Sequence, residues 1–183
     1  MEQLVKTIKN NNIRIIAIDG RCASGKTTYA QKLSEILNAE IIHMDDFFLS
    51  NELKTKERLN EVGGNIDYVR FITDVLEKLK IENCFAYQRF DCTNQRLSNM
   101  ITINNNSYII IEGTYALHPK FINYYDYKIF MTVNHNIQIE RLEVRNPRLI
   151  DRFINEWIPL EEKYFDALMI KNQADYIIDT SYI

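Results

Sequence analysis

The feature that most constrains this chain is the segment GRCASGKT at residues 20–27. Before it, the isoleucine-rich run from Ile13 to Ile18 is typical of a buried parallel strand. After it, Ala30, Leu33 and Leu37 recur at three- and four-residue steps, which predicts an amphipathic helix. A strand, a glycine-bearing loop and a helix in this order bring backbone amides together at a helix N-terminus, where they can bind phosphate.

The residue types in this loop suit a nucleotide and its metal ion. Gly20 and Gly25 permit backbone conformations that are closed to other residues. We expect Lys26 to reach the β- and γ-phosphates and the Thr27 hydroxyl to bind Mg²⁺. An ordinary glycine turn with an exposed lysine is the alternative, and the flanking strand and helix argue against it. The loop residues expected to bind the nucleotide are Gly20, Ala23, Ser24, Gly25, Lys26, Thr27 and Thr28.

Length, composition and charge favour a single domain over residues 1–183. The chain is 46% hydrophobic and 26% charged, which is ordinary for a globular protein. No apolar stretch approaches the roughly 20 residues that cross a bilayer, and the N-terminus has no apolar signal core. We therefore expect a cytoplasmic protein with no membrane partner. The net charge of −3 argues against nucleic acid as the main partner.

Predicted strands and helices alternate along the chain. Further strands are expected at 40–44, 107–113, 127–133 and 174–179, with a hairpin from 84–91 and 99–104. A helix is expected from Asp67 to Leu79, with Val69, Ile72, Leu76 and Leu79 on its buried face. This order predicts an α/β fold in which helices flank a parallel sheet and ligands bind at the carboxyl ends of the strands.

Acidic residues follow two of these strands. Asp45 and Asp46 come after the strand at 40–44, and Glu112 ends a buried run, where it can hold water bound to Mg²⁺. Alternate residues of an extended segment point to opposite sides, so we expect Asp45 to face the pocket and Asp46 to face solvent or cap a helix. Asp67 follows a glycine pair and is expected either to contact a polar substrate or to cap the next helix.

Four arginines, Arg141, Arg145, Arg148 and Arg152, fall within twelve residues. On a helix, Arg141 shares a face with Arg145, and Arg148 with Arg152. A solvated helix face is the alternative. In a chain that carries a phosphate loop, the cluster favours a lid that closes on phosphates, so we expect Arg145 and Arg148 to be catalytic and Arg141 to contact the nucleotide.

Two classes of function fit these features. One is a kinase that transfers a phosphoryl group to a small acceptor, and the other is a nucleotide-driven switch or motor. The chain has neither the NKxD motif of guanine-nucleotide switches nor the LSGGQ signature of transporter ATPases. A carboxylate after the second strand and a late arginine cluster favour the kinase, because a closing lid excludes water from the transfer.

In chain order, the segments GRCASGKTT, HMDDFF, GGNIDYVRF, AYQRFD and IIIEGTYALHP resemble the uridine kinase branch of the P-loop kinases. That branch includes phosphoribulokinase, bacterial pantothenate kinase and nicotinamide riboside kinase. The resemblance spans nearly the whole chain. It implies a P-loop fold with a five-stranded parallel sheet, a small hairpin and an arginine-rich lid, with ATP and Mg²⁺ as cosubstrates, and phosphorylation of a primary hydroxyl.

The resemblance also implies roles for single residues. Asp45 matches the family's general base and magnesium neighbour, Asp67 matches an aspartate that binds ribose hydroxyls, and Tyr87 matches an aromatic residue near the acceptor. AYQRFDC replaces the PxYDF pattern of uridine kinases, which puts Arg89 and Asp91 where the base would be read. The implied acceptor is a nucleoside, uridine or cytidine, phosphorylated at its 5'-hydroxyl. Nicotinamide riboside and pantothenate are the alternative acceptors.

Overall fold

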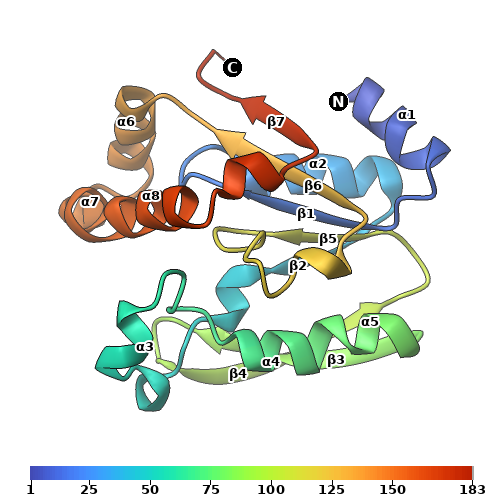
Figure 1. The fold of residues 1–183 in the computed structure, drawn as a ribbon, viewed down its shortest axis with the longest axis horizontal. Coiled ribbons are helices and arrows are strands. Elements are labelled where there is room, and N and C mark those ends of the chain that lie inside the picture. Colours follow the sequence, from blue (N-terminus) through green and yellow to red (C-terminus); the bar gives the residue numbers. More distant parts are fainter. Residues whose placement is uncertain (183) are drawn as a thin grey trace.

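A parallel sheet of five strands forms the centre of the computed structural model, which describes residues 1–182. The strand order is β2-β5-β1-β6-β7, and every pairing within the sheet is parallel. Helices lie on both sides of this sheet (Figure 1), which confirms the expected α/β fold. The strands are β1 (Ile15–Gly20), β2 (Glu40–His43), β5 (Ile109–Glu112), β6 (Tyr127–Thr132) and β7 (Tyr176–Asp179).

Each face of the sheet has its own hydrophobic core, because alternate residues of a strand point to opposite sides. Ile16 and Ile18 of β1 pack with α1 (Glu2–Asn10) and α2 (Lys26–Leu37) on one face. Ala17, between them, faces the second core, to which the hairpin and α8 (Ile158–Ala167) contribute. Helix α1 lies outside the elements that we expected from the sequence.

The predicted hairpin is present as β3 (Cys84–Asp91) and β4 (Arg96–Asn104), which pair antiparallel. Phe85, Tyr87 and Ile103 on one side of the hairpin pack in the second core. Strand β4 begins at Arg96, earlier than expected, because the turn is short. The Asp91 carboxylate closes this turn by accepting hydrogen bonds from the backbone N–H groups of Thr93 and Asn94, at 2.8 and 3.1 Å.

The helix expected from Asp67 to Leu79 is divided into α4 (Tyr68–Phe71), a π-helical turn at Ile72–Leu76 and α5 (Lys78–Ile81). A π-helical turn contains more residues than an α-helical one, so it rotates the residues before it relative to those after it. The prediction that Val69 lies on the buried face is therefore wrong. Its side chain is 63% exposed, and Phe71 and Val75 are buried instead.

The arginine-rich segment is not one helix. Helix α6 (His135–Arg145) is followed by a 3₁₀ turn at Pro147–Leu149, by α7 (Ile150–Arg152) and by a π-helical turn at Phe153–Trp157 that leads into α8. A proline has no N–H to continue the preceding helix. Arg148 and Arg152 consequently lie in different elements and do not share one helix. We use "lid" for residues 145–161.

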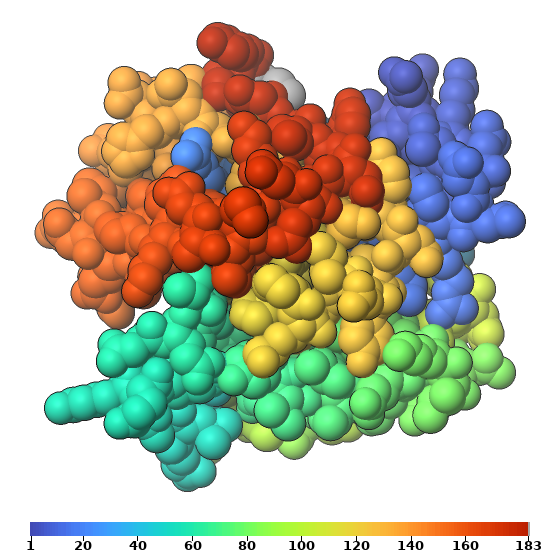
Figure 2. Space-filling view, in the orientation of Figure 1, coloured from blue at the N-terminus to red at the C-terminus, as the bar shows by residue number. Residues whose placement is uncertain are grey.

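A short helix, α3 (Lys56–Asn60), follows the second strand, and the segment after it meets α8, as Figure 2 shows in teal and orange-red. This packing is close, since a side chain placed at Gly63 would lie 3.4 Å from the ring of Tyr164. In the part of the chain that the structure describes, no helix is both long and apolar enough to span a membrane.

Asp19 is fully buried at the carboxyl end of β1 and joins three parts of the fold. One carboxylate oxygen accepts hydrogen bonds from the N–H groups of Gly20 and Tyr115, at 2.6 and 3.1 Å. The other accepts from the N–H of Leu117 and the hydroxyl of Tyr164, both at 2.8 Å. Burial raises the pKa of Asp19 to about 6, although the hydrogen bonds from Leu117, Gly20 and Tyr164 lower it. The phosphate loop, the segment after β5 and α8 therefore meet at one carboxylate.

This arrangement predicts that an amide cannot replace the Asp19 carboxylate. Both oxygens accept from backbone N–H groups, so the NH₂ group of an asparagine would face a donor in either orientation. We expect Asp19→Asn to lower the free energy of unfolding by about 1–3 kcal/mol, even though it removes a buried charge. Urea unfolding followed by circular dichroism measures this change.

Asp151→Asn is the matched control, because Asp151 is exposed on α7. This variant should change the free energy of unfolding by less than about 0.5 kcal/mol. Equal stability of the Asp19→Asn protein and the unaltered protein would contradict the role given to Asp19.

Candidate active site

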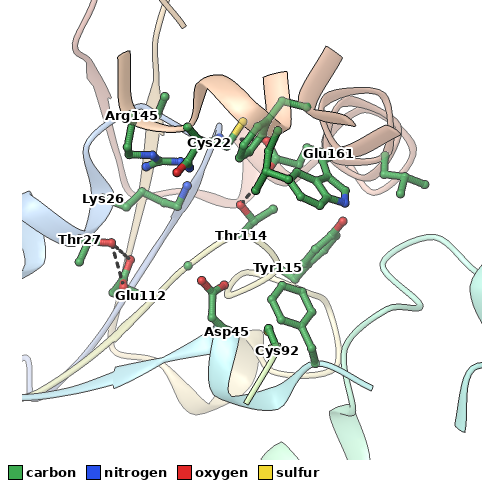
Figure 3. Close-up of a pocket in the computed structure, with 18 of the residues that line it drawn as sticks. Cys22, Lys26, Thr27, Asp45, Cys92, Glu112, Thr114, Tyr115, Arg145 and Glu161 are labelled. Atoms are coloured by element: carbon green, nitrogen blue, oxygen red, sulfur yellow. Dashed lines mark hydrogen bonds between the residues drawn. The ribbon is translucent and has the colours of Figure 1, made fainter. Parts of the chain in front are cut away.

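A cavity of about 650 Å³ lies at the carboxyl ends of the central strands (Figure 3). The phosphate loop and Glu112 line one end, and Asp45 lies between this end and Tyr115. We use "aromatic wall" for the aromatic residues of the lining, which are Phe48, Tyr115, Phe153 and Trp157. Residues of the lid cover the cavity. The predicted location of ligands at the strand ends thus coincides with this cavity.

Local backbone geometry explains why the phosphate loop needs its glycines. Gly20 has φ +136°, and a Cβ atom there would lie 1.9 Å from the carbonyl oxygen of Met131 on β6. Gly25 has φ +86°, a left-handed conformation, and directly precedes α2. The first glycine is required by space and the second by conformation, so that the loop amides gather at the N-terminus of α2.

Lys26 is folded back onto its own loop. Its Nζ donates hydrogen bonds to the carbonyl oxygens of Gly20 and Arg21, at 2.7 and 2.8 Å, and its side chain is nearly buried. The ammonium group therefore lies at the centre of the loop and lines the cavity (Figure 3). A phosphate that bound there would compete with these two carbonyls for the same donor.

Glu112 is a buried carboxylate with fixed partners. The Thr27 hydroxyl donates to its two oxygens at 3.2 and 3.3 Å, as Figure 3 shows, and His43 Nδ1 lies 2.5 Å from one of them. The hydrogen bond to Glu112 raises the pKa of His43 above its ordinary value. Thr27 and Glu112 were expected to lie near one metal ion, and the structure brings them into contact.

Asp45 points into the same cavity, which is accessible to solvent (Figure 3). The protein atoms around it raise the pKa of its carboxyl by desolvation, and the nearby charge of Glu112 adds to this effect. Asp45 and Glu112 supply oxygen atoms, which are the ligands that Mg²⁺ prefers. Over residues 1–182, no group of three or more His, Cys, Asp or Glu side chains could hold a metal ion by itself. A magnesium ion would accordingly depend on nucleotide phosphates and water for its other ligands.

The prediction that Asp46 faces solvent or caps a helix is wrong. Its side chain is almost fully buried, with one oxygen 2.9 Å from Nε of Arg89 and the other accepting a 2.9 Å hydrogen bond from the hydroxyl of Tyr87. The two aspartates lie in a 3₁₀ turn at Met44–Phe47 and not in the extended segment that we expected, and this turn directs Asp45 to the cavity and Asp46 away from it. The side opposite the cavity is the hairpin rather than solvent.

Three residues predicted to bind substrate, Tyr87, Asp67 and Arg89, lie outside the cavity lining. The ring of Tyr87 is buried in the second core, and its hydroxyl is bound to Asp46. Asp67 caps α4 by accepting a 3.1 Å hydrogen bond from the N–H of Arg70, and it lines a separate shallow hollow. The sequence left two roles open for Asp67, substrate contact and helix capping, and in the structure Asp67 caps α4. Arg89 contacts Asp46 and is otherwise exposed.

The arginines of the cluster separate into different environments. Arg145 lines the cavity on the side of Lys26 (Figure 3). Arg141 lies behind the phosphate loop, where it donates to the carbonyl oxygen of Ala23 at 3.1 Å and to that of Thr180 at 2.7 Å. Arg148 is exposed and is not part of the lining, and Arg152 pairs with Glu156 at 3.0 Å.

Sequence reasoning missed a carboxylate in the lid. Glu161 is 7% exposed and lines the cavity, where it accepts hydrogen bonds from the N–H of Cys22 at 2.9 Å and the hydroxyl of Thr114 at 3.1 Å (Figure 3). Burial raises its pKa, and the charge of Lys26 opposes this effect. The sequence signal that could have predicted its burial is the helical spacing, because Glu161 lies on the same helical face as the buried residues Ile158 and Phe165.

Four aromatic side chains line the cavity. The core contributes Phe48 and Tyr115, and the lid contributes Phe153 and Trp157, which pack in one cluster with Cys22 and Ala23 of the phosphate loop. The rings of Phe153 and Trp157 pack edge to face, with centroids 4.6 Å apart. One cavity therefore combines polar groups that suit phosphate with aromatic side chains that suit the apolar part of a small molecule.

Two curated proteins match most of this chain. Uridine kinase-like protein 5 of Arabidopsis thaliana is 28% identical over 181 residues, which cover 90% of this chain and 38% of that protein. The tRNA-specific adenosine deaminase subunit tad2 of Schizosaccharomyces pombe is 23% identical over 177 residues, which cover 90% of this chain and 43% of that protein. The chain thus spans less than half the length of these curated relatives.

A solved structure described as a possible uridine kinase from Bacillus stearothermophilus superposes with a TM-score of 0.74 at 20% identity. The superposition covers 97% of this chain and 96% of that one, and it shows a shared fold. A model of the phosphoribulokinase / uridine kinase family matches residues 15–147, which include the phosphate loop, Asp45 and Glu112. The chain therefore belongs to the phosphoribulokinase / uridine kinase family of kinases.

Proposed function

We propose that this protein transfers the γ-phosphoryl group of ATP to a primary hydroxyl of a small molecule, most specifically the 5'-hydroxyl of a nucleoside such as uridine or cytidine. The observation that carries the proposal is the single cavity in which the phosphate loop, Asp45 and an aromatic wall face one space (Figure 3). Membership of the family supports phosphoryl transfer to a small acceptor. The choice of ATP rests on the resemblance to this family, and the choice of a nucleoside rests on that resemblance and on the aromatic side chains of the cavity.

On the nucleotide side, the loop amides and Lys26 would bind the phosphates, and Arg145 would meet them from the lid. Thr27, with Glu112 and Asp45 nearby, would hold a magnesium ion on the phosphate oxygens, where it neutralises charge during transfer. Catalysis of phosphoryl transfer depends mostly on positioning and electrostatics, and the residues of this end provide both.

On the acceptor side, Asp45 suits the role of general base. Among the residues that the structure describes, its carboxylate has no hydrogen bond or ion pair to another side chain, so its oxygens are free to accept a proton. Asp46 is already bound to Arg89 and Tyr87. A hydroxyl of the acceptor placed between Asp45 and the phosphate loop would lie in line for transfer.

The aromatic wall favours a nucleoside over an acceptor without a ring. A planar base has apolar faces that can stack on the rings of Phe48, Tyr115 or Trp157, whereas pantothenate has no ring to place there. Nicotinamide riboside also carries a ring and is the nearest competitor. A nucleotide-driven switch or motor binds no small acceptor and needs no aromatic wall for one. The aromatic wall therefore favours a kinase over a switch or motor.

The first test compares the two neighbouring aspartates. If Asp45 is the base, Asp45→Asn should lower kcat by about 10²- to 10⁴-fold while ATP still binds. Asp46→Asn should lower kcat by less than about tenfold, and its main effect should be reduced thermal stability, because the pair with Arg89 is lost. Steady-state kinetics and thermal unfolding of both proteins measure these effects.

Magnesium titration of the same variants separates two roles of Asp45. A rate that stays low at excess magnesium means that the base is lost, and a rate that recovers means that Asp45 acts mainly through the ion. If Asp46→Asn were the inactive variant and Asp45→Asn were fully active, the assignment of the base would be wrong.

A second prediction concerns the lid arginines. Arg145 lines the cavity, and charge develops on the phosphoryl group mainly in the transition state, so Arg145→Ala should lower kcat more than it raises KM for ATP. Arg148→Ala removes the same charge from a position outside the lining and should have a clearly smaller effect. An equal decrease of kcat in the two variants would contradict this prediction, because it would show that net charge, rather than contact with the phosphates, explains the decrease.

A further inference from the structure

Two successive carboxylates of α8 hold two successive residues of the phosphate loop. Glu161 accepts a 2.9 Å hydrogen bond from the N–H of Cys22. Glu162 forms a two-point pair with the Arg21 guanidinium, at 2.6 and 2.8 Å. Arg21 also donates to the carbonyl oxygen of Val133, just after β6, at 3.2 Å. Two side chains of α8 therefore fix this helix to the phosphate loop, although helix and loop lie more than a hundred residues apart in the sequence.

The contact of Glu161 is unusual because a carboxylate, which is an anion, binds to a loop that is expected to bind phosphate. The carboxylate is buried beside Lys26 and occupies a loop N–H, in a cavity that we propose binds a chain of phosphates. Thr114, which follows Glu112 by two residues, donates to the second oxygen. A carboxylate of the protein thus already occupies an N–H of the phosphate loop, next to the residues that are expected to bind the nucleotide.

We propose that Glu161 is an internal anion of the phosphate loop, which a nucleoside triphosphate must displace, and that this exchange couples nucleotide binding to the position of α8. The proposal rests on the proposed function only in taking a nucleotide as the ligand of the loop. Trp157 and Leu160, which line the cavity, lie four residues and one residue before Glu161 in the lid. Release of Glu161 would therefore also move the wall against which the acceptor is placed.

The test exploits a substitution that removes the charge and keeps the hydrogen bonds. In Glu161→Gln, the amide oxygen can accept from the N–H of Cys22, and the NH₂ group can donate to the hydroxyl of Thr114. Like charges that share a partly desolvated site repel each other, so loss of the charge should favour an incoming phosphate. Glu161 acts here through the loop and is a positioning residue.

The measurement is the dissociation constant of a non-hydrolysable ATP analogue with Mg²⁺, determined by isothermal titration calorimetry without any acceptor. Glu161→Gln should bind the analogue about three- to tenfold more tightly than the unaltered protein, with a smaller gain for ADP, which carries less charge. Glu156→Gln is the matched control, since it removes one lid charge that pairs with Arg152 outside the cavity lining. Glu156→Gln should change the dissociation constant of the analogue by less than about twofold.

Unchanged or weaker binding by a folded Glu161→Gln protein would overturn the proposal. If this variant does not fold, amide hydrogen exchange of the unaltered protein decides the question. Binding of the ATP analogue should speed exchange in α8, and equal or slower exchange there would overturn the proposal. Both measurements concern binding alone, so their failure would leave the Asp45 and Asp46 comparison, and with it the proposed function, intact.

Discussion

The hydrogen bonds to Asp19 are the interaction on which the rest of the site depends. They tie the start of the phosphate loop to the segment after β5 and to Tyr164 of α8. These three parts carry Lys26, Thr114 and Glu161, which all line the cavity. A buried carboxylate with four donors is costly to desolvate but well satisfied, and such groups fix one arrangement of the elements around them.

Carboxylates gather around the phosphate loop, and their different partners separate their roles. Backbone N–H groups hold Asp19 and Glu161, the hairpin holds Asp46, and Thr27 and His43 hold Glu112. Asp45 remains available to the cavity. This division explains why two adjacent aspartates can differ in function: the backbone turns one toward the cavity, and the hairpin neutralises the other.

Local sequence patterns were sufficient to predict the phosphate loop, the strands of the sheet and the hairpin. Each of these depends on residues close together in the chain, such as Gly25 before α2. The errors arose from contacts over long sequence distances. Asp46 is buried because the hairpin brings Arg89 to it, and Glu161 lies in the cavity because α8 folds back over the loop.

Helix irregularities limited the sequence predictions in a different way. The face that includes Val69 was misassigned because a π-helical turn changes the helical register, and no simple residue pattern marks such a turn. Helix α6 ends at Arg145, shortly before Pro147, and the position of Arg148 beyond it depends on how the lid packs. The chemistry of the loop was therefore more predictable than the side chains that close over it.

The most direct test of the account is acceptor-dependent formation of ADP from ATP and Mg²⁺. Uridine, cytidine, nicotinamide riboside, pantothenate and simple sugars would be compared with water, and the products identified by phosphorus NMR. We predict that a nucleoside raises the rate of ADP formation far above the water background, with one phosphorylated 5'-hydroxyl for each ADP released. A rate that stays at the water background with every acceptor would contradict phosphoryl transfer to a small hydroxyl and would favour a nucleotide-driven switch.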